Sequence, residues 1–142
     1  MGILQGLANA KGYTDWQISS AGLSAFTDAP ATAHAVEVAR EQGVDISHHQ
    51  ARRFDPEMGG ECDLILALSG EHYEQVRAWG PAVAARTYLL KQFPKPGNPG
   101  PPAWVRDPIG GELEAYRRTF LELDEVLRRI LPELGHWAGI DE

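Results

Sequence analysis

Hydrophobic and polar positions in the first third of the chain predict two helices and a strand between them. Apolar residues at helical spacing predict an amphipathic helix over residues 1–11, and β-rich alternation predicts a short strand over 16–20. A second helix is predicted to start near Asp28 or Thr32, either of which can serve as its N-cap. Gly43 is predicted to end that helix.

The middle of the chain combines short helices with two apolar strands. A short helical turn is predicted over 47–53 with Ser47 as its cap, and Asp55 is predicted to cap another turn that ends at a Gly-Gly pair. The continuous apolar run at 63–68 is typical of a strand that is covered on both faces in a parallel sheet. Residues 86–90 predict a further strand. Between the strands, Ser69 is predicted to cap a helix that carries Tyr73, Val76 and Trp79.

The last part of the chain predicts a loop followed by a long helix. Prolines and glycines over 93–102 oppose regular structure and predict either an ordered surface loop or a flexible excursion. Residues 107–111, Asp-Pro-Ile-Gly-Gly, follow it, and helical periodicity then predicts an amphipathic helix over 112–134. Because strands alternate with helices, the fold class is predicted to be α/β with a mainly parallel sheet.

Composition narrows the functional classes. The chain has 142 residues, 43% of them hydrophobic, which predicts a single domain with its own core. A formal net charge of -7 disfavours nucleic acid as a partner. The one cysteine, Cys62, excludes an internal disulfide, which favours the cytoplasm, and no apolar run is long enough to span a membrane. We expect neither a metal nor an organic cofactor, and the sequence leaves the oligomeric state open.

Three positions are candidates for chemistry. Loops that follow predicted strands come first, because parallel sheets bind ligands at the carboxyl ends of their strands, whereas Cys62 lies before or at the start of the 63–68 strand. The hydroxyl of Ser20 could hold a neighbouring phosphate-binding loop, although Ser-Ala-Gly is also ordinary turn sequence. Cys62 has Leu68 six positions later, where a phosphate-binding arginine would be needed, so we interpret it as a small buried hydrophobic residue. Asp107, held extended by Pro108, could protonate a leaving oxygen, or could belong to the N-terminal turn of the last helix.

Four segments, in order, resemble the low-molecular-weight protein phosphatase family, which includes phosphotyrosine and phosphoarginine phosphatases and arsenate reductases. Residues 18–22, Ile-Ser-Ser-Ala-Gly, are similar to the family's second strand and turn. Residues 43–52 resemble its Gly-Ile-Asp-x-Ser-x-His-x-Ala/Ser-Arg stretch, and 63–68 resemble its Asp-Leu-Ile-Leu strand. Residues 107–111, followed by Tyr116 and the long helix, resemble its general-acid loop.

The resemblance implies a small doubly wound, flavodoxin-like three-layer fold and a phosphatase acting on phosphorylated protein side chains. In the family, a cysteine in a Cys-x5-Arg loop attacks phosphorus, and the aspartate of the Asp-Pro pair protonates the leaving group. The matching acid here is Asp107. The resemblance also implies that Phe26 and Ile109 form walls of the substrate pocket. It further implies that the phosphate-binding loop is supported by Ser20, His49 and Arg52.

The Cys-x5-Arg loop itself is missing from the 142 residues. In the family this loop, with the first and central strand, precedes the helix that residues 1–11 resemble. We therefore expect that the chain is N-terminally incomplete and inactive as it stands, and that the complete protein is a phosphotyrosine or phosphoarginine phosphatase. The alternative is a non-catalytic pseudophosphatase or interaction module. Arsenate reduction is disfavoured because it needs further redox cysteines.

Overall fold

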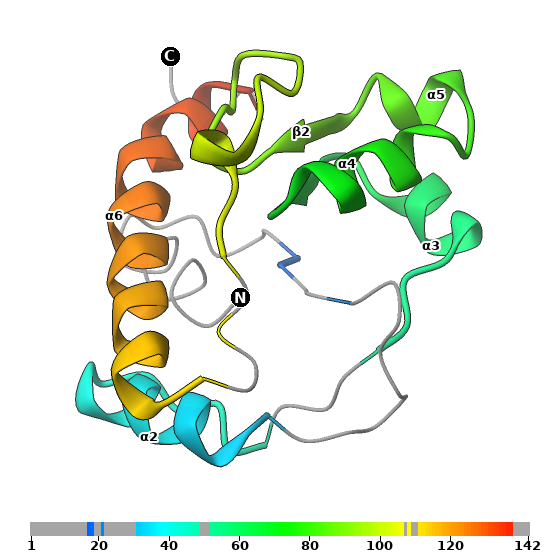
Figure 1. The fold of residues 1–142 in the computed structure, drawn as a ribbon. Helices are drawn as coiled ribbons and strands as arrows, with labels where there is room; N and C mark the ends of the chain where they lie inside the picture. The colour runs from blue at the N-terminus through cyan, green and yellow to red at the C-terminus, as the bar shows by residue number, and fades with distance from the viewer. Residues whose placement is uncertain are drawn as a thin grey trace. The chain divides into compact units, whose positions relative to one another are not determined.

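The computed structural model describes the fold over most of the chain and divides it into two compact units. Unit 1 comprises Met1–Arg53 and Asp107–Glu142, and unit 2 comprises Phe54–Arg106 (Figure 1). The predicted helix over 1–11 lies outside the described residues, as does the predicted strand over 16–20 except for its residues 17–18. The described residues are 17–18, 21, 31–48, 52–106, 108 and 111–137.

Unit 2 is built on a parallel pair of strands. Strand β1 (Ile65–Ala67) pairs with β2 (Thr87–Leu89), in a register that sets Ile65 opposite Thr87 and Ala67 opposite Leu89. Both strands lie within the ranges predicted for them, 63–68 and 86–90, and their end residues are buried while the middle residue of each is half-buried. The parallel strand pair of the predicted α/β class is therefore confirmed in this unit.

The chain crosses from β1 to β2 through two helices. Helix α4 (Gly70–Arg77) starts at Ser69, whose Oγ accepts a hydrogen bond from the His72 N–H at 3.4 Å, as predicted. Its residues Tyr73 and Val76 are buried and form its inner face, and α4 contacts both strands. Trp79, predicted on the same helix, lies beyond its end. The second crossover helix is the short α5 (Pro81–Ala84).

Helix α3 (Pro56–Glu61) precedes β1 and starts where the sequence predicted. Asp55 is its N-cap, and its Oδ1 accepts a hydrogen bond from the Met58 N–H at 2.9 Å. The Gly-Gly pair does not end this helix but lies within it. Gly59 is buried, and a Cβ there would lie 3.2 Å from the indole ring of Trp79, so the absence of a side chain lets helix and tryptophan approach closely.

The proline segment, residues 93–102, is an ordered loop rather than a flexible excursion. Gly97 and Gly100 have positive φ angles of 99° and 121°, which only glycine adopts readily. A short 3-10 helix, η1 (Pro101–Ala103), overlaps its end, so the prediction of no regular structure is wrong there. Backbone hydrogen bonds order the start of the segment, where the Phe93 N–H donates to the Leu89 carbonyl at 2.9 Å.

In unit 1, helix α2 (Ala33–Glu41) is capped by Thr32, whose side chain accepts a hydrogen bond from the Ala35 N–H at 3.3 Å. Gly43 follows the helix with a φ of 78°, as the sequence predicted. Ser47 does not cap a helix in the described residues. Instead its N–H and hydroxyl both donate to Asp45 Oδ1, at 2.9 and 2.6 Å.

Helix α6 (Leu113–Trp137) is the longest helix described, and α2 packs beside its amino-terminal turns (Figure 1). It starts within one residue of the predicted position and runs three residues past the predicted end, through Pro132. Its buried face confirms the predicted amphipathic pattern. The buried hydrophobic residues of α6 are Tyr116, Val126, Leu127, Ile130, Leu131 and Leu134.

Candidate functional site

The segment that leads to the predicted acid is anchored at the carboxyl end of β1. The Val105 N–H donates a hydrogen bond of 2.8 Å to the carbonyl of Leu68, the residue directly after the strand. Val105 is buried, whereas Arg106 is exposed. Asp107 itself lies outside the described residues. The described chain thus reaches the edge of the parallel sheet where ligands bind in α/β folds, two residues before Asp107.

Side chains from α4 and from the proline segment hold this anchor. The indole Nε1–H of Trp104 donates to Asn98 Oδ1 at 2.8 Å, and the Gly97 N–H donates to the hydroxyl of Tyr73 at 3.2 Å. The indole of Trp104 also lies over Gly70, where a Cβ would overlap the ring. These contacts make one connected cluster, which we call the tryptophan cluster: Gly70, Tyr73, Asn98 and Trp104.

Sequence reasoning missed the tryptophan cluster. Its members come from two segments that are separated by strand β2, so no local periodicity joins them. The available signal is chemical. Buried Tyr and Trp side chains usually find partners for their O–H and N–H groups, and Asn98 is an amide set between prolines close to Trp104.

An open hollow of about 330 Å³ lies beside the carboxyl end of β2. Lys91 and Gln92, which follow the strand, supply its polar groups, and the rest of its lining comes from the proline segment and η1. Among the described residues that line it, none is a cysteine, serine or histidine. The hollow therefore offers the polar groups of Lys91 and Gln92 for hydrogen bonding. Its lining residues are Lys91, Gln92, Pro99, Gly100, Pro102 and Ala103.

On the other side of Asp107, in unit 1, a tight turn leads into α6. The Gly111 N–H donates to the Pro108 carbonyl at 2.8 Å. A Cβ on Gly111 would lie 2.9 Å from that carbonyl oxygen and 3.0 Å from the Cβ of Ala115, so the turn and the first turn of the helix fit together only around a glycine. This turn fixes the position of Pro108 relative to α6.

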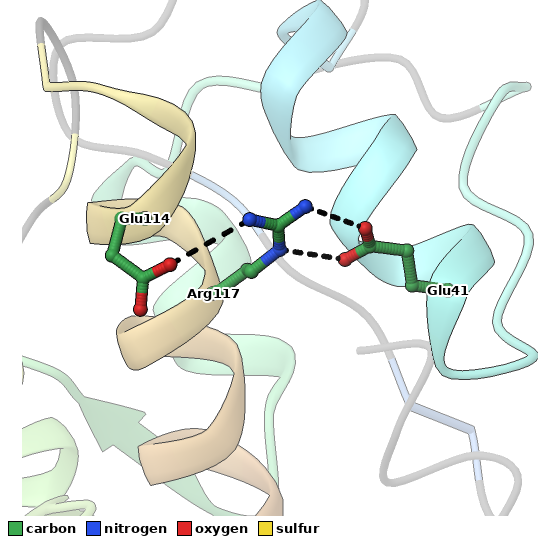
Figure 2. Close-up of polar contacts among 3 residues, drawn as sticks. All are labelled: Glu41, Glu114 and Arg117. Atoms are coloured by element: carbon green, nitrogen blue, oxygen red, sulfur yellow. Dashed lines mark hydrogen bonds and ion pairs between the residues drawn. The ribbon is translucent and has the colours of Figure 1, made fainter.

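The beginning of α6 is tied to α2 by polar and aromatic contacts. Arg117 binds both carboxylate oxygens of Glu41, with Nε donating at 3.0 Å and Nη2 at 2.8 Å (Figure 2). Glu114 lies 3.6 Å from Nη1 of the same guanidinium. The ring of Tyr116 lies 5.4 Å from that of His34 on α2. Two neighbouring residues of α6 thus contact opposite ends of α2.

Hydrogen bonding shifts the pKa of two exposed carboxylates in unit 1. Arg117 donates hydrogen bonds to the Glu41 carboxylate, and these bonds lower the pKa of Glu41 and raise the pKa of Arg117. The hydroxyl of Ser47, followed by its backbone N–H, lowers the pKa of Asp45. Both carboxylates are therefore held ionised, as structural hydrogen-bond acceptors rather than as proton donors.

Cys62 is half-buried rather than fully buried, and it ends α3. Its Sγ donates a hydrogen bond of 3.2 Å to the Met58 carbonyl, while Nη1 of Arg86 donates to the carbonyl of Cys62 at 2.8 Å. The interpretation of Cys62 as a buried residue is therefore corrected, because its thiol is half-buried and hydrogen-bonded.

One of the predicted site residues lies in the described part of the chain. Arg52 is exposed and follows the turn at Ser47. The other predicted site residues lie outside the described residues, so the structure does not place them: Ser20, Phe26, His49, Asp107 and Ile109.

Two further features concern ligands and membranes. Within the described ranges, no three side chains of His, Cys, Asp or Glu lie together as a metal ion would require. Over the same ranges, no helix combines the length and the apolar character needed to cross a bilayer. Helix α6, although long, has charged residues along one face.

Comparison with known proteins gives one family. The model of the family described as low molecular weight phosphotyrosine protein phosphatase matches residues 2–137. The chain is 39% identical over 77 residues to the low molecular weight protein-tyrosine-phosphatase Etp of Escherichia coli strain K12, covering 54% of this chain and 52% of that protein. The aligned part of the chain therefore spans about half the length of this relative.

Two other matches cover more of the chain. The protein-arginine-phosphatase of Bacillus subtilis strain 168 is 30% identical over 117 residues, which is 82% of this chain and 75% of that protein. The crystal structure of the low molecular weight protein tyrosine phosphatase from T. tengcongensis superposes with a TM-score of 0.81 at 33% identity, covering 93% of this chain and 86% of that one. These matches confirm the predicted α/β fold.

Proposed function

Because the chain belongs to the low molecular weight phosphotyrosine protein phosphatase family, we propose that it hydrolyses phosphotyrosine or phosphoarginine side chains of proteins. The observation that carries the proposal is the family match over residues 2–137. Relatives named for each substrate are similar to the chain. Both phosphotyrosine and phosphoarginine are therefore assayed as substrates in the experiment below.

The proposed chemistry has two steps. A cysteine thiolate attacks phosphorus, an S–P bond forms, and the bond to the leaving oxygen or nitrogen breaks as Asp107 donates its proton to that atom. Water then attacks the phosphocysteine, a P–O bond forms as the S–P bond breaks and returns the thiolate, the Asp107 carboxylate takes a proton from the water, and phosphate leaves. Pro108 restricts Asp107 to extended conformations, which limits the directions in which its carboxyl can point.

The thiolate must come from a Cys-x5-Arg loop, and the 142 residues contain none. Cys62 is a poor substitute, because its thiol donates to a carbonyl and Leu68 stands where the arginine is needed. We infer that these residues alone turn over no phosphomonoester, and that they form one phosphatase-like domain which works with such a loop. The remaining roles follow the resemblance. Phe26 and Ile109 line the substrate pocket, while Ser20, His49 and Arg52 support the loop, in a cytoplasmic protein.

The experiment compares residues 1–142 with a version in which the family's first strand and Cys-x5-Arg loop precede Met1. Each is assayed for phosphate release from a phosphotyrosine peptide and from a phosphoarginine peptide. We expect turnover only in the extended version, abolished by Cys→Ser in the added loop and reduced by about 10²-fold or more by Asp107→Asn. Turnover by residues 1–142 that Cys62→Ser abolishes would overturn the proposal.

A second candidate is a non-catalytic module of the same fold. These 142 residues hold no Cys-x5-Arg sequence, and taken by themselves they fit such a module. Absence of turnover in both versions, with the extended version shown to be folded by circular dichroism and cooperative unfolding, would select this candidate over the phosphatase.

A further inference from the structure

An ion-pair network joins the end of α2 to the beginning of α6 within unit 1. The guanidinium of Arg117 donates to both oxygens of Glu41, at 2.8 and 3.0 Å, and Glu114 approaches it from the other side (Figure 2). We call these three residues the arginine clamp. Bidentate pairing of this kind fixes the guanidinium plane as well as its position, which a single contact does not do.

The position of Glu41 indicates that the clamp acts between the helices. Glu41 is the last residue of α2, where the negative end of the helix dipole disfavours a carboxylate. The residue therefore gives its own helix no electrostatic benefit at that end. Its favourable contact is with Arg117 on α6, and that contact joins the two helices.

A second contact between the two helices fixes the angle of α6 relative to α2. Tyr116, next to Arg117, is buried and lies against His34 in the first turn of α2. His34 and Glu41 are seven positions apart on one helix, about 10 Å along its axis. Two contacts at that separation fix the angle of α6 against α2 as well as the distance, so the first turns of α6 have a defined direction.

The orientation of α6 also sets the orientation of the turn that precedes it, because the two are joined at Gly111. Gly111 joins the turn to the helix through its hydrogen bond to the Pro108 carbonyl, and its lack of a side chain lets Ala115 pack against the turn. Pro108 is bonded to Asp107. We propose that Arg117, held by Glu41, is a positioning residue for Asp107. This inference rests on the proposed function, in which Asp107 is the acid.

The clamp is exposed, and this determines what its loss should do. The side chains of Arg117 and Glu41 are 39% and 36% exposed, and ion pairs at such positions add little to global stability. The effect of breaking the clamp should therefore appear as loss of order in the Pro108–Gly111 turn, with little change in the unfolding midpoint of the chain.

The first test is amide hydrogen exchange in residues 1–142. We expect Arg117→Ala and Glu41→Gln to speed exchange of the Gly111 N–H about fivefold or more, with the Leu90 N–H, which donates to the Ala67 carbonyl, unchanged as a reference in unit 2. Arg117→Lys should restore part of the protection, because an ammonium keeps the charge without the two-pronged geometry.

The matched control is Arg128→Ala. Arg128 pairs with Asp124 at 3.0 Å on the same helix, as an exposed pair that does not reach α2. The Arg128→Ala variant should therefore leave hydrogen exchange of the Gly111 N–H unchanged. Equal acceleration by Arg128→Ala and Arg117→Ala, or no acceleration by either clamp variant, would overturn the positioning role.

The second test uses the extended version with the Cys-x5-Arg loop. If Arg117 positions the acid, Arg117→Ala should lower kcat about tenfold or more for an alkyl phosphate, whose leaving group needs a proton, and much less for p-nitrophenyl phosphate. General structural damage would lower kcat equally for both substrates, and that result would overturn the inference. Absence of turnover in the extended parent would count against the proposed function alone, because the exchange measurement decides the clamp independently.

Discussion

The indole of Trp104 occupies the space that a side chain at Gly70 would fill, at the first residue of α4. Gly70→Ala should therefore force the ring or the helix to move and lower the free energy of unfolding by about 1–3 kcal/mol. Urea denaturation followed by circular dichroism measures this. Gly60→Ala is the control, because a Cβ there meets nothing within 4 Å and Gly60 lies inside α3, so the change should be neutral or slightly stabilising.

Asn98 accepts the indole N–H of Trp104 and also the Gly100 N–H, at 2.8 and 3.3 Å. Asn98→Ala leaves these donors without that acceptor and should destabilise the protein by about 1–2 kcal/mol. Trp104→Phe removes the indole donor, so the double variant should cost less than the sum of the two single changes. Strict additivity in this double-mutant cycle would contradict a coupled pair.

Asp55 is the N-cap of α3, and its carboxylate accepts from the Met58 N–H. Asp55→Ala should cost about 1 kcal/mol, whereas Asp55→Asn keeps an oxygen at the same place and should cost much less. Thermal and urea unfolding of the three proteins provide the measurement. Equal losses in the two variants would show that the charge, rather than the capping bond, is what matters.

Pro132 lies inside α6 and is exposed. It lacks the N–H that would bond to the carbonyl four residues earlier, at Arg128, and its ring crowds that turn. Pro132→Ala should stabilise the protein by about 1–3 kcal/mol. Glu133→Ala, at the next exposed position, should change stability by less than about 0.5 kcal/mol. A destabilised Pro132→Ala variant would mean that the proline makes a contact worth more than the missing hydrogen bond.

The pKa of Glu41 is lowered by its hydrogen bonds from Arg117. Because the folded value lies below the unfolded one, the carboxylate contributes stability above the unfolded pKa, and that contribution is lost as the pH falls through the folded pKa. A titration of the Glu41 carboxyl carbon by NMR should show a midpoint below 4.5 in the parent. In Arg117→Ala the midpoint should rise toward that ordinary value. An unchanged midpoint would contradict the hydrogen bonds as its cause.

The elements that the sequence predicted well are those with a strong local signal. The apolar run that contains β1 and the periodic apolar face of α6 can be recognised from neighbouring residues alone. The sequence carries a weaker local signal for where a helix ends. Trp79 continues the spacing of Tyr73 and Val76 yet lies beyond α4, because Gly80, with a φ of 145°, redirects the chain there.

The interactions around the candidate site could not be predicted in this way. The contact of Trp104 with Gly70 and the pairing of Arg117 with Glu41 join residues from separate elements, so their spacing in the sequence carries no periodic signal. The Asp-Pro pair makes Asp107 a candidate acid from the sequence alone, and the resemblance of its motif to a family then matches it to a general acid. Its role depends on a proposed reaction and not on a described contact.

The parallel pairing of β1 with β2 has a consequence for how unit 2 assembles. Parallel neighbours cannot be joined by a tight hairpin, so the sheet closes only after α4 and α5 have carried the chain back to the same end. We therefore expect the helices to gain structure early and the two strands to come together late in folding. A ribosome-bound fragment that stops before residue 87 would hold β1 without its described neighbour.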